Sequence, residues 1–314
     1  MSKQKNSDVV VFGDLFLDLV MSGFQRLPEL GQEALASHFH RETGGGAAHT
    51  SCGLAILGLR TKLVGAVGAA EIEWFQKRLG SKGVDLQGVI VHPNEPTATT
   101  VAVSTSQDRV FYTYAGANRS LPQLLRDSSI RERMASARHV HFAHLIEAGC
   151  LEELAAWLHD QGCTVSIDIG WDEEWLGSPA TVKALREVDW FLPNEREAER
   201  ASGQSEPRRM LQWFEDHGLQ GVVLKLGPDG AIARSARTTV HQPAYPLQPI
   251  ETTGAGDCFD AGFLFAWLNR KELEECLAWG NICGAMSTQR AGGIDGFPSR
   301  EEVERALKQY RGKT

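Results

Sequence analysis

A run of small residues followed by a single carboxylate is the part of this sequence best suited to chemistry. The segment from Glu251 to Asp257 reads ETTGAGD and leads directly into the apolar stretch CFDAGF. If Gly254, Ala255 and Gly256 begin a helix, their uncovered N–H groups and the helix dipole bind a phosphate or another oxyanion. A carboxylate beside a bound anion is unfavourable unless it has a role. The role we predict for Asp257 is to accept the proton of a hydroxyl that attacks phosphorus, so the segment predicts phosphoryl transfer to an alcohol.

Strands that alternate with helices position this segment. The apolar runs that we interpret as strands are 8–12, 63–67, 89–91, 140–142, 164–167, 190–192 and 222–225, with a closing hairpin at 231–233 and 239–241. The helices that we predict are 44–59, 71–82, 151–161, 179–186, 195–202, 207–217, one that follows the glycine segment, 273–289 and 299–310. This alternation predicts an α/β fold with a mostly parallel central sheet and helices on both faces.

A second, smaller sheet is predicted from β-rich runs outside this alternation. Residues 97–103 and 110–114 are rich in Thr, Val, Phe and Tyr and form a predicted hairpin around a turn at Gln107 and Asp108. Residues 33–42 alternate weakly and read as an exposed strand. Together, about 15–42 and 97–115 predict a small β lid over a site. No repeat or linker divides the chain, so we expect one domain over 1–314, and an exposed lid could pair two subunits as a homodimer.

Composition excludes several classes of function. The 314 residues carry a net charge of −8, which leaves no basic surface for nucleic acid or anionic membranes. No run of 18 apolar residues predicts a membrane span, and the N-terminus lacks the features of a signal peptide. Six cysteines without a C-x-x-C pair indicate reduced thiols, so we expect a cytoplasmic protein. The cluster of His139, His141 and His144 has no adjoining acid or cysteine in the sequence, which argues against a metal site.

Five separated motifs give the chain a resemblance to a known family. They are Gly13 with Asp18, the GGGAAH run at 44–49, the NERE run at 194–197, the LKLGPDG run at 224–230 and the TTGAGD run at 252–257. In this order they resemble the PfkB, or ribokinase-like, carbohydrate kinases, and the resemblance spans nearly the whole chain. It implies a ribokinase-like fold and an ATP-dependent sugar kinase that uses Mg²⁺.

The resemblance also implies which residues bind the sugar. An Asp after the first strand binds sugar hydroxyls in the family, a role that we assign to Asp18 with Asp14 as the competing candidate. The turn formed by Gly44, Gly45 and Gly46 would lie against the sugar, because the backbone itself approaches the ligand there. His49 departs from the Asn usual at its position. It either donates a hydrogen bond to a hydroxyl or phosphate, or is a packed helix residue.

On the nucleotide side, the resemblance assigns Asn194 and Glu197 to the water shell of Mg²⁺, a role compatible with Asn194 as a helix cap. Glu251 replaces the Asp that binds a monovalent cation in many relatives, so K⁺ is an optional further cofactor, with residues 290–293 completing its site. The remaining predicted nucleotide contacts are Lys225, Gly227 and Gly230, which border the ATP site, and Asn281 near the adenine.

Three alternatives remain open at this stage. A nucleoside kinase of the same fold would need a base pocket, for which Phe16, Phe111 and Tyr112 are available. A phosphosugar kinase would need cations near the acceptor, for which Arg109 and Arg119 are available. A non-catalytic sugar-binding regulator would not need the carboxylate of Asp257.

Overall fold

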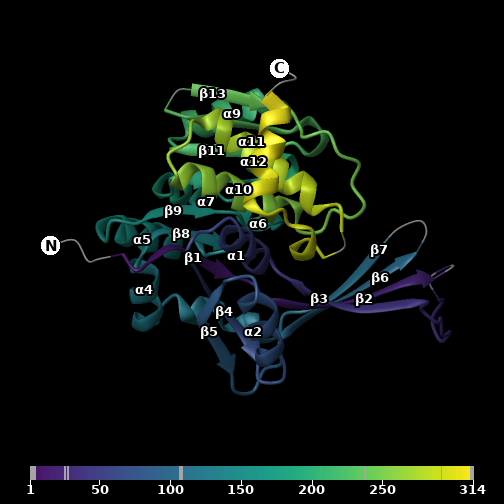
Figure 1. Cartoon of the computed structure of the whole chain (residues 1–314). Coiled ribbons are helices and arrows are strands. Elements are labelled where there is room, and N and C mark those ends of the chain that lie inside the picture. Colours follow the sequence, from purple (N-terminus) through teal and green to yellow (C-terminus); the bar gives the residue numbers. More distant parts are fainter. Residues whose placement is uncertain are drawn as a thin grey trace.

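A large sheet crosses the middle of the molecule (Figure 1). The computed structural model describes residues 5–24, 26, 28–105, 109–236, 238–290 and 292–311. Among them, nine strands form the sheet in the order β13-β12-β11-β10-β9-β8-β1-β4-β5. Pairing is parallel from β11 to β5 and antiparallel in the β11-β12-β13 meander. The strands are β1 (Ser7–Gly13), β4 (Thr61–Gly68), β5 (Asp85–His92), β8 (Ala137–Ala143), β9 (Thr164–Ile167), β10 (Trp190–Phe191), β11 (Gly221–Lys225), β12 (Ala231–Ser235) and β13 (Thr238–Gln242).

Helices cover both faces of this sheet, which is why its strands read as continuous apolar runs. In β1, Val9 and Val11 pack into one hydrophobic core, and Val10 and Phe12 pack into the other. The first core lies under α1 (Gly46–Ile56), α2 (Ile72–Gly80), α10 (Ala255–Leu268), α11 (Leu273–Ser287) and α12 (Arg300–Arg311). The second lies under α3 (Leu121–Leu124), α4 (Ser128–Ala135), α5 (Ala148–Asp160), α6 (Glu173–Leu176), α7 (Pro179–Ala184), α8 (Glu195–Ser202) and α9 (Pro207–Asp216). The predicted α/β fold is confirmed.

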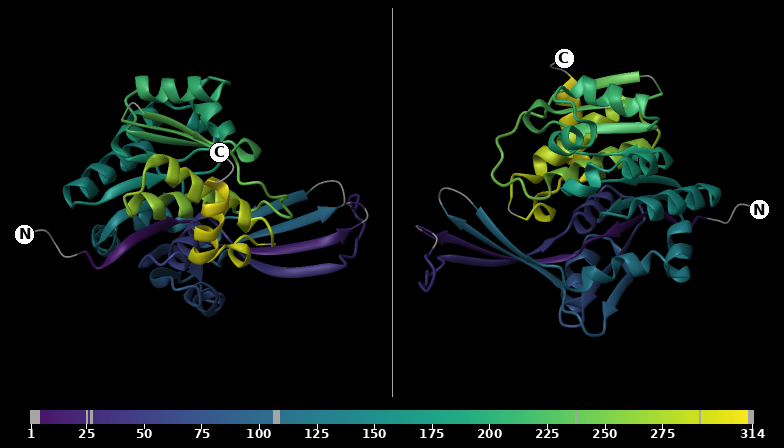
Figure 2. Two further views of the ribbon diagram at one scale, coloured as in Figure 1. Left: turned by 45° about the horizontal axis from the view of Figure 1, so that its top comes forward. Right: turned by 180° about the vertical axis from the view of Figure 1, so that it is seen from behind.

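A separate four-stranded sheet stands off the main body (Figures 1 and 2). Its order is β3-β2-β6-β7, with β2 parallel to β6 and the other two pairings antiparallel. The strands are β2 (Phe16–Phe24), β3 (His38–Gly44), β6 (Ala98–Thr105) and β7 (Arg109–Tyr114). They lie within the segments predicted for the lid except at the end of β3, which extends two residues beyond position 42. The predicted turn at Gln107 and Asp108 lies outside the described residues.

Element boundaries differ from the predictions in a few places. The exposed strand predicted over 33–42 begins only at His38 and continues to Gly44, where it meets the glycine turn. The helix predicted to reach residue 59 ends at Ile56, and Gly58 then has a φ of +102°, which glycine adopts without strain. The sequence prediction missed α3, α4 and α6, which are short. None of the described helices has the length and apolar character needed to cross a membrane.

Candidate active site

Polar side chains gather at one edge of the large sheet, where its parallel strands end. Asp14 follows β1, His144 follows β8 and Asp168 follows β9. Lys225 is the last residue of β11, and Asn194 follows β10 and bridges to it. The carboxyl edge of a parallel sheet is where such folds bind ligands, so the search for a site starts here.

The start of α10 has the geometry of an oxyanion site. Gly254 precedes the helix with a φ of +72°, and Ala255, Gly256 and Asp257 form the first turn, whose N–H groups have no partner within the helix. The amide of Ala255 donates to the carbonyl of Thr252 at 3.2 Å. Thr50 of α1 donates a hydrogen bond of 3.2 Å to the carbonyl of Asp257, so the two helices are joined at this point. The amides and the helix dipole therefore favour a bound anion in front of α10.

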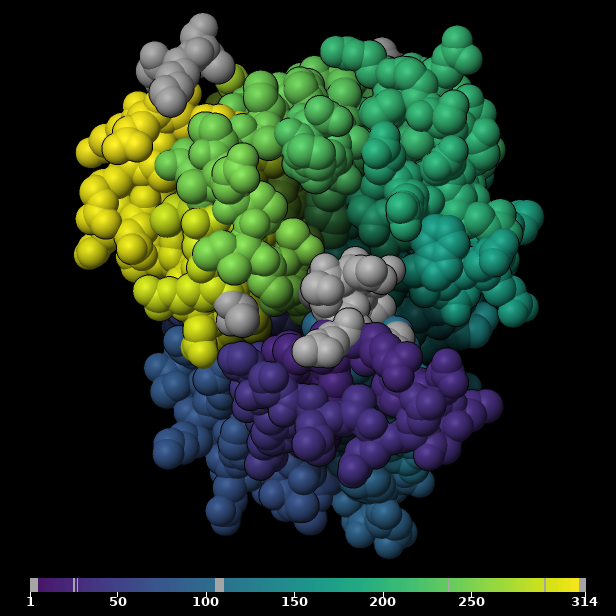
Figure 3. All heavy atoms as spheres, turned by 90° about the vertical axis from the view of Figure 1, so that its right-hand side faces the viewer, coloured from purple at the N-terminus to yellow at the C-terminus, as the bar shows by residue number. Residues whose placement is uncertain are grey.

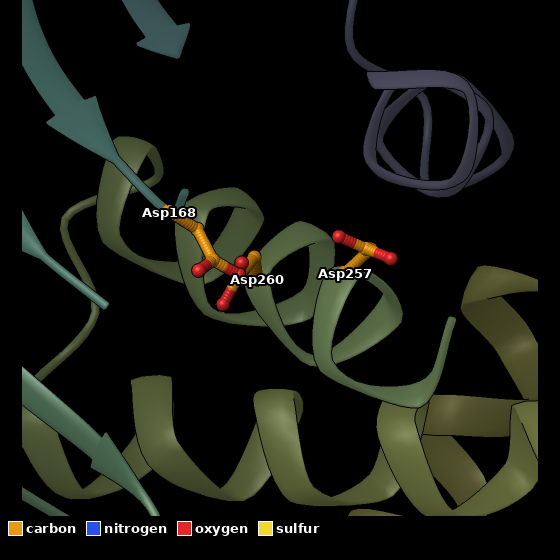
Figure 4. Close-up of side chains that lie close together, drawn as sticks. All are labelled: Asp168, Asp257 and Asp260. Atoms are coloured by element: carbon orange, nitrogen blue, oxygen red, sulfur yellow. The ribbon is translucent and has the colours of Figure 1, made fainter. Parts of the chain in front are cut away.

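The carboxylate of Asp257 points out of the core and toward α1 (Figure 4). A quarter of its side chain is exposed, and its Oδ2 lies 4.0 Å from Nδ1 of His49. A Cβ on Gly46 would lie 2.7 Å from Oδ1 of Asp257, so only glycine leaves room for the carboxylate. Burial raises the pKa of Asp257, an effect that His49 opposes and Asp168 reinforces. A carboxylate with a raised pKa is a better proton acceptor, as a general base requires.

Two further acids, Asp168 and Asp260, point toward one another beside Asp257 (Figure 4). Nζ of Lys225 lies 2.5 Å from Oδ2 of Asp168 and 3.3 Å from Oδ1 of Asp260. Burial raises the pKa of Asp260 far above its usual value, with Asp168 adding to the shift. Burial alone would raise the pKa of Asp168 as well, but Lys225 and a hydrogen bond from Asp260 lower it. Lys225 therefore offsets part of the negative charge that Asp168 and Asp260 bring to this cluster.

The predicted magnesium residues form a helix cap. Asn194 caps α8. Its Oδ1 accepts from the backbone N–H of Glu197 at 3.0 Å, and its backbone N–H donates to Oε2 of Glu197 at 2.8 Å. Glu197 is buried, and burial, with Asp168 adding to it, raises the pKa of Glu197 to about 7. The predicted cap is confirmed, and it holds the Glu197 carboxylate near Asp168 and Asp257.

The predicted nucleotide residues lie around the β11–β12 turn. Gly227 and Gly230 both have positive φ there, at 58° and 89°. Asn281 lies on α11, is buried and donates to the carbonyls of Gln242 at 3.0 Å and Pro243 at 2.8 Å. Its side chain therefore fastens the segment after β13. Lys225, also predicted for the nucleotide, is engaged by the two acids described above and lies beneath Gly256.

A cavity of about 140 Å³ lies between the small sheet and the loops before α10 and after α11. Asp18 lines this cavity, whereas the carboxylate of Asp14 lies 2.7 Å from His144 and is not among the lining residues. The cavity is lined by Asp18, Val20, His40, Glu42, Thr43, His49, Thr100, Ala102, Ser104, Phe111, Glu251, Thr253 and Gly292. Figure 3 views the molecule from this side, with the purple small sheet below the green and yellow C-terminal half.

The glycine turn brings this cavity and the start of α10 together. A Cβ on Gly44 would lie 2.3 Å from Oδ2 of Asp18, and a Cβ on Gly45 would lie 2.2 Å from the carbonyl of Asp14. His49 follows the turn, with its Nδ1 at 2.9 Å from the carbonyl of Gly45. The ring is buried, and its Nε2 has no hydrogen-bond partner among the described residues. His49 also lines the cavity, so both roles considered for it, a hydrogen bond to a hydroxyl or phosphate and a packed helix residue, stay predictions.

Glu251 joins the two loops that border the cavity. Its Oε1 accepts from the amide of Thr253 at 2.7 Å, and its Oε2 accepts from the amide of Gly292 at 3.2 Å. Both carboxylate oxygens therefore already hold backbone groups, and the remaining part of the predicted cation site includes Ala291, which lies outside the described residues.

Comparison with known proteins identifies the family. Residues 6–300 match the family described as pfkB family carbohydrate kinase. The chain belongs to the PfkB family. The ATP-dependent ribose-1-phosphate kinase of Halopiger xanaduensis is 31% identical to this PfkB kinase over 270 residues, which are 85% of this chain and 87% of the relative. The 2-dehydro-3-deoxygluconokinase of Bacillus subtilis is 26% identical and covers 97% of this chain and 96% of its own length. Among solved structures, Arabidopsis thaliana ribokinase complexed with ribose and ATP superimposes with a TM-score of 0.87 at 27% identity, covering 96% of this chain and 99% of the ribokinase.

Three acids of this PfkB site were missed by the sequence analysis. Asp168 directly follows a buried strand, and Asp260 lies one turn after Asp257 inside an otherwise apolar helix. Both patterns are recognisable signals, since an unpaired acid is rarely buried. Glu42 gave no such signal, because the strand that contains it reads as exposed. The histidine cluster has no adjoining acid in the sequence, but folding places Asp14 against one of its members, His144.

Proposed function

We propose that this PfkB kinase transfers the γ-phosphoryl group of ATP to a hydroxyl of a small carbohydrate, with Asp257 as the general base. The observation that carries the proposal is the position of Asp257. It lies at the amide-lined start of α10, against Gly46 of the turn that borders the cavity. The Arabidopsis ribokinase, whose structure contains ribose and ATP, supports the choice of a sugar and a nucleotide as the two ligands.

In the proposed reaction, ATP lies along the Gly227–Gly230 turn with its γ-phosphate in front of the amides of α10. Asp18 and the glycine turn hold the sugar, and the carboxylate of Asp257 accepts the proton of the attacking hydroxyl. The sugar oxygen forms a bond to phosphorus as the bond from phosphorus to the ADP oxygen breaks. The amides stabilise the charge on the transferred group, as in other sites built from backbone donors.

The acids beside Asp257 fit a magnesium ion held through water. Oxygens of Asp168, Asp257 and Asp260 all lie within 4.8 Å of one another, and Glu197 is nearby. Because Lys225 offsets part of this charge, we assign Glu197 and Asn194 to the waters of Mg²⁺ rather than to the ion itself. When bound, Mg²⁺ neutralises negative charge on the phosphates. A K⁺ ion fits less well, since direct binding to Glu251 would displace an amide that its carboxylate now holds, and we assign K⁺ no step.

The test of the proposed function is acceptor-dependent release of ADP. Purified enzyme with Mg·ATP should release ADP only when a carbohydrate is present, and the product should carry the phosphate on one hydroxyl. A nucleoside kinase is the second candidate, because Phe111, one of three aromatic residues considered for a base pocket, lines the cavity. Including nucleosides in the acceptor panel separates the two. Binding of sugars without any turnover would instead support a non-catalytic regulator.

The acid limb of turnover should report Asp18 together with Asp257, because burial raises the pKa of both carboxylates. Burial raises the pKa of Asp18 to about 6, and Glu42 and Glu251 add to this shift. Because only the ionised carboxylate accepts from two sugar hydroxyls, kcat/KM should fall as the pH drops through about 6. Direct measurement of ADP across pH would show this limb. An acid limb at the ordinary value of 3.8 would contradict the assignment.

We also propose that the small sheet is a lid and that its outer face pairs two subunits. Strand register places Leu19, Val101 and Tyr112 side by side on the face opposite the cavity, with Phe39 beside Met21. Phe39 and Tyr112 are more than half exposed, so this apolar face gains most by packing against its own copy. Phe39→Asp should convert a dimer into a monomer in analytical ultracentrifugation. A wild-type monomer at micromolar concentration would refute the proposal.

A further inference from the structure

The cavity beneath the small sheet has an acidic lining. Asp18, Glu42 and Glu251 all contribute to it, and none of its described lining residues is a lysine or an arginine. Asp18 and Glu42 are direct cross-strand partners of β2 and β3, so their side chains share the face that covers the cavity. Any anionic group bound here would lie close to three carboxylates.

Arg78 offsets only part of this charge. Nη2 of Arg78 lies 2.5 Å from Oε2 of Glu42 and 2.8 Å from Oδ2 of Asp295, so the guanidinium is shared between two acids. Lys82 pairs with the same Asp295 at 3.4 Å. Arg119, considered earlier for a phosphosugar, lies 4.0 Å from Glu95 and stacks over Tyr114, neither of which lines the cavity.

Asp18 is the acid of the lining whose carboxylate is available to accept hydrogen bonds from the acceptor. No described residue donates a hydrogen bond to its carboxylate, and Glu42 and Glu251 reinforce the effect of burial in raising its pKa. A hydroxyl donates to such a carboxylate, whereas a phosphate or carboxylate of the acceptor is repelled by it. The neighbouring Ala102 and Phe111, which are cross-strand partners, offer an apolar wall that suits the C–H groups of a sugar ring.

We propose that the acceptor is an uncharged polyhydroxy compound and that the acidic lining excludes phosphorylated and carboxylated sugars. The inference rests on the proposed function and narrows its substrate class. It sets this chain apart from two of the three relatives named above, those named for ribose 1-phosphate and 2-dehydro-3-deoxygluconate, both of them anions.

The test compares matched acceptors in the ADP assay. The panel contains neutral pentoses, hexoses, polyols and nucleosides, together with the phosphate-bearing and carboxylate-bearing forms of the same skeletons. Two like charges a few ångströms apart near a protein surface repel enough to weaken binding roughly 100-fold. We therefore expect the best acceptor to be uncharged and its anionic counterpart to have a kcat/KM lower by roughly 100-fold.

Removing an acidic side chain from the cavity lining should weaken the preference for neutral over anionic acceptors. Glu42→Gln removes one negative charge and leaves Arg78 paired with Asp295 alone, so the ratio of neutral to anionic kcat/KM should fall by at least about tenfold. Glu29→Gln is the matched control, because Glu29 is exposed in the connection between β2 and β3 and bonds only to Gln32 among the described residues. Thermal melting confirms that each variant is folded. Calorimetric binding of the same pairs to Asp257→Asn separates binding from turnover.

The outcomes separate this inference from the proposed function. A best acceptor that is anionic would overturn the inference and leave the kinase assignment intact. Arg109 lies at the tip of the sheet face that covers the cavity, and its side chain lies outside the described ones. If Arg109→Ser abolishes the use of an anionic acceptor, the inference is overturned and the kinase assignment stands. If no acceptor supports ADP release, the proposed function fails. An unchanged ratio in Glu42→Gln would show that the lining does not select by charge.

Discussion

Asp257→Asn is expected to lower kcat by up to about 10⁴-fold, the contribution typical of a positioned proton acceptor. The amide has nearly the same size as the carboxylate and fits between Gly46 and His49, so substrate binding should persist. The variant cannot accept the hydroxyl proton, which leaves only the amides of α10 to assist transfer. Single-turnover measurement of phosphoryl transfer, with the KM for ATP alongside, would show a loss confined to the chemical step.

The stability of this variant gives a second check. Burial raises the pKa of Asp257, so the ionised side chain is disfavoured by the fold at neutral pH, above the pKa of an unfolded Asp. A neutral Asn removes that cost, and the melting temperature at pH 7 should be equal or higher. Asp216→Asn, on the exposed end of α9, is a control that should leave kcat unchanged. Near-normal turnover by Asp257→Asn would refute the role of general base.

Much of the fold was predictable because its signals are local. The apolar strands of the large sheet and the amphipathic helix α9 carry their patterns within a few residues. The capping pair of Asn194 and Glu197 is likewise contained in one turn of helix. The length of β3 was not predictable, because its residues are largely exposed and gain their pairing from β2, a nonlocal partner.

The candidate site likewise contains residues that could be predicted from the sequence and residues that could not. Asp257 and the glycines of α10 lie together in sequence, so their chemistry could be inferred directly. The Asp168–Lys225–Asp260 cluster joins the residue after β9, the last residue of β11 and a residue of α10, and only the folded sheet brings them within hydrogen-bond distance. The pairing of Asp14 with His144 across β1 and β8 is hidden for the same reason. The resemblance assigned roles to single residues, whereas the charge of the cavity required the three-dimensional arrangement.

Gly254→Ala should be nearly as damaging as loss of the base, although it removes no functional group. Gly254 has a φ of +72°, and a Cβ there would lie 2.5 Å from Cδ2 of His49. The ring of His49 is buried and held at the carbonyl of Gly45, so it has little freedom to move away. The turn must shift instead, which moves the amides of α10 from the position of the phosphoryl group. Loss of a single oxyanion donor costs about 10²–10³-fold in kcat in other enzymes, and we expect a loss of that order.

Gly203→Ala separates backbone strain from this effect. Gly203 ends α8 with a φ of +66°, close to that of Gly254, but a Cβ there would meet no atom within 4 Å. Both variants should lose about 1–2 kcal/mol of unfolding free energy from the left-handed conformation, measured by chemical denaturation. Only Gly254→Ala should lose turnover. Equal kcat values for the two variants would mean that the start of α10 does not bind the transferred phosphoryl group. The amides are displaced only in Gly254→Ala, and that displacement would then have no effect on the reaction.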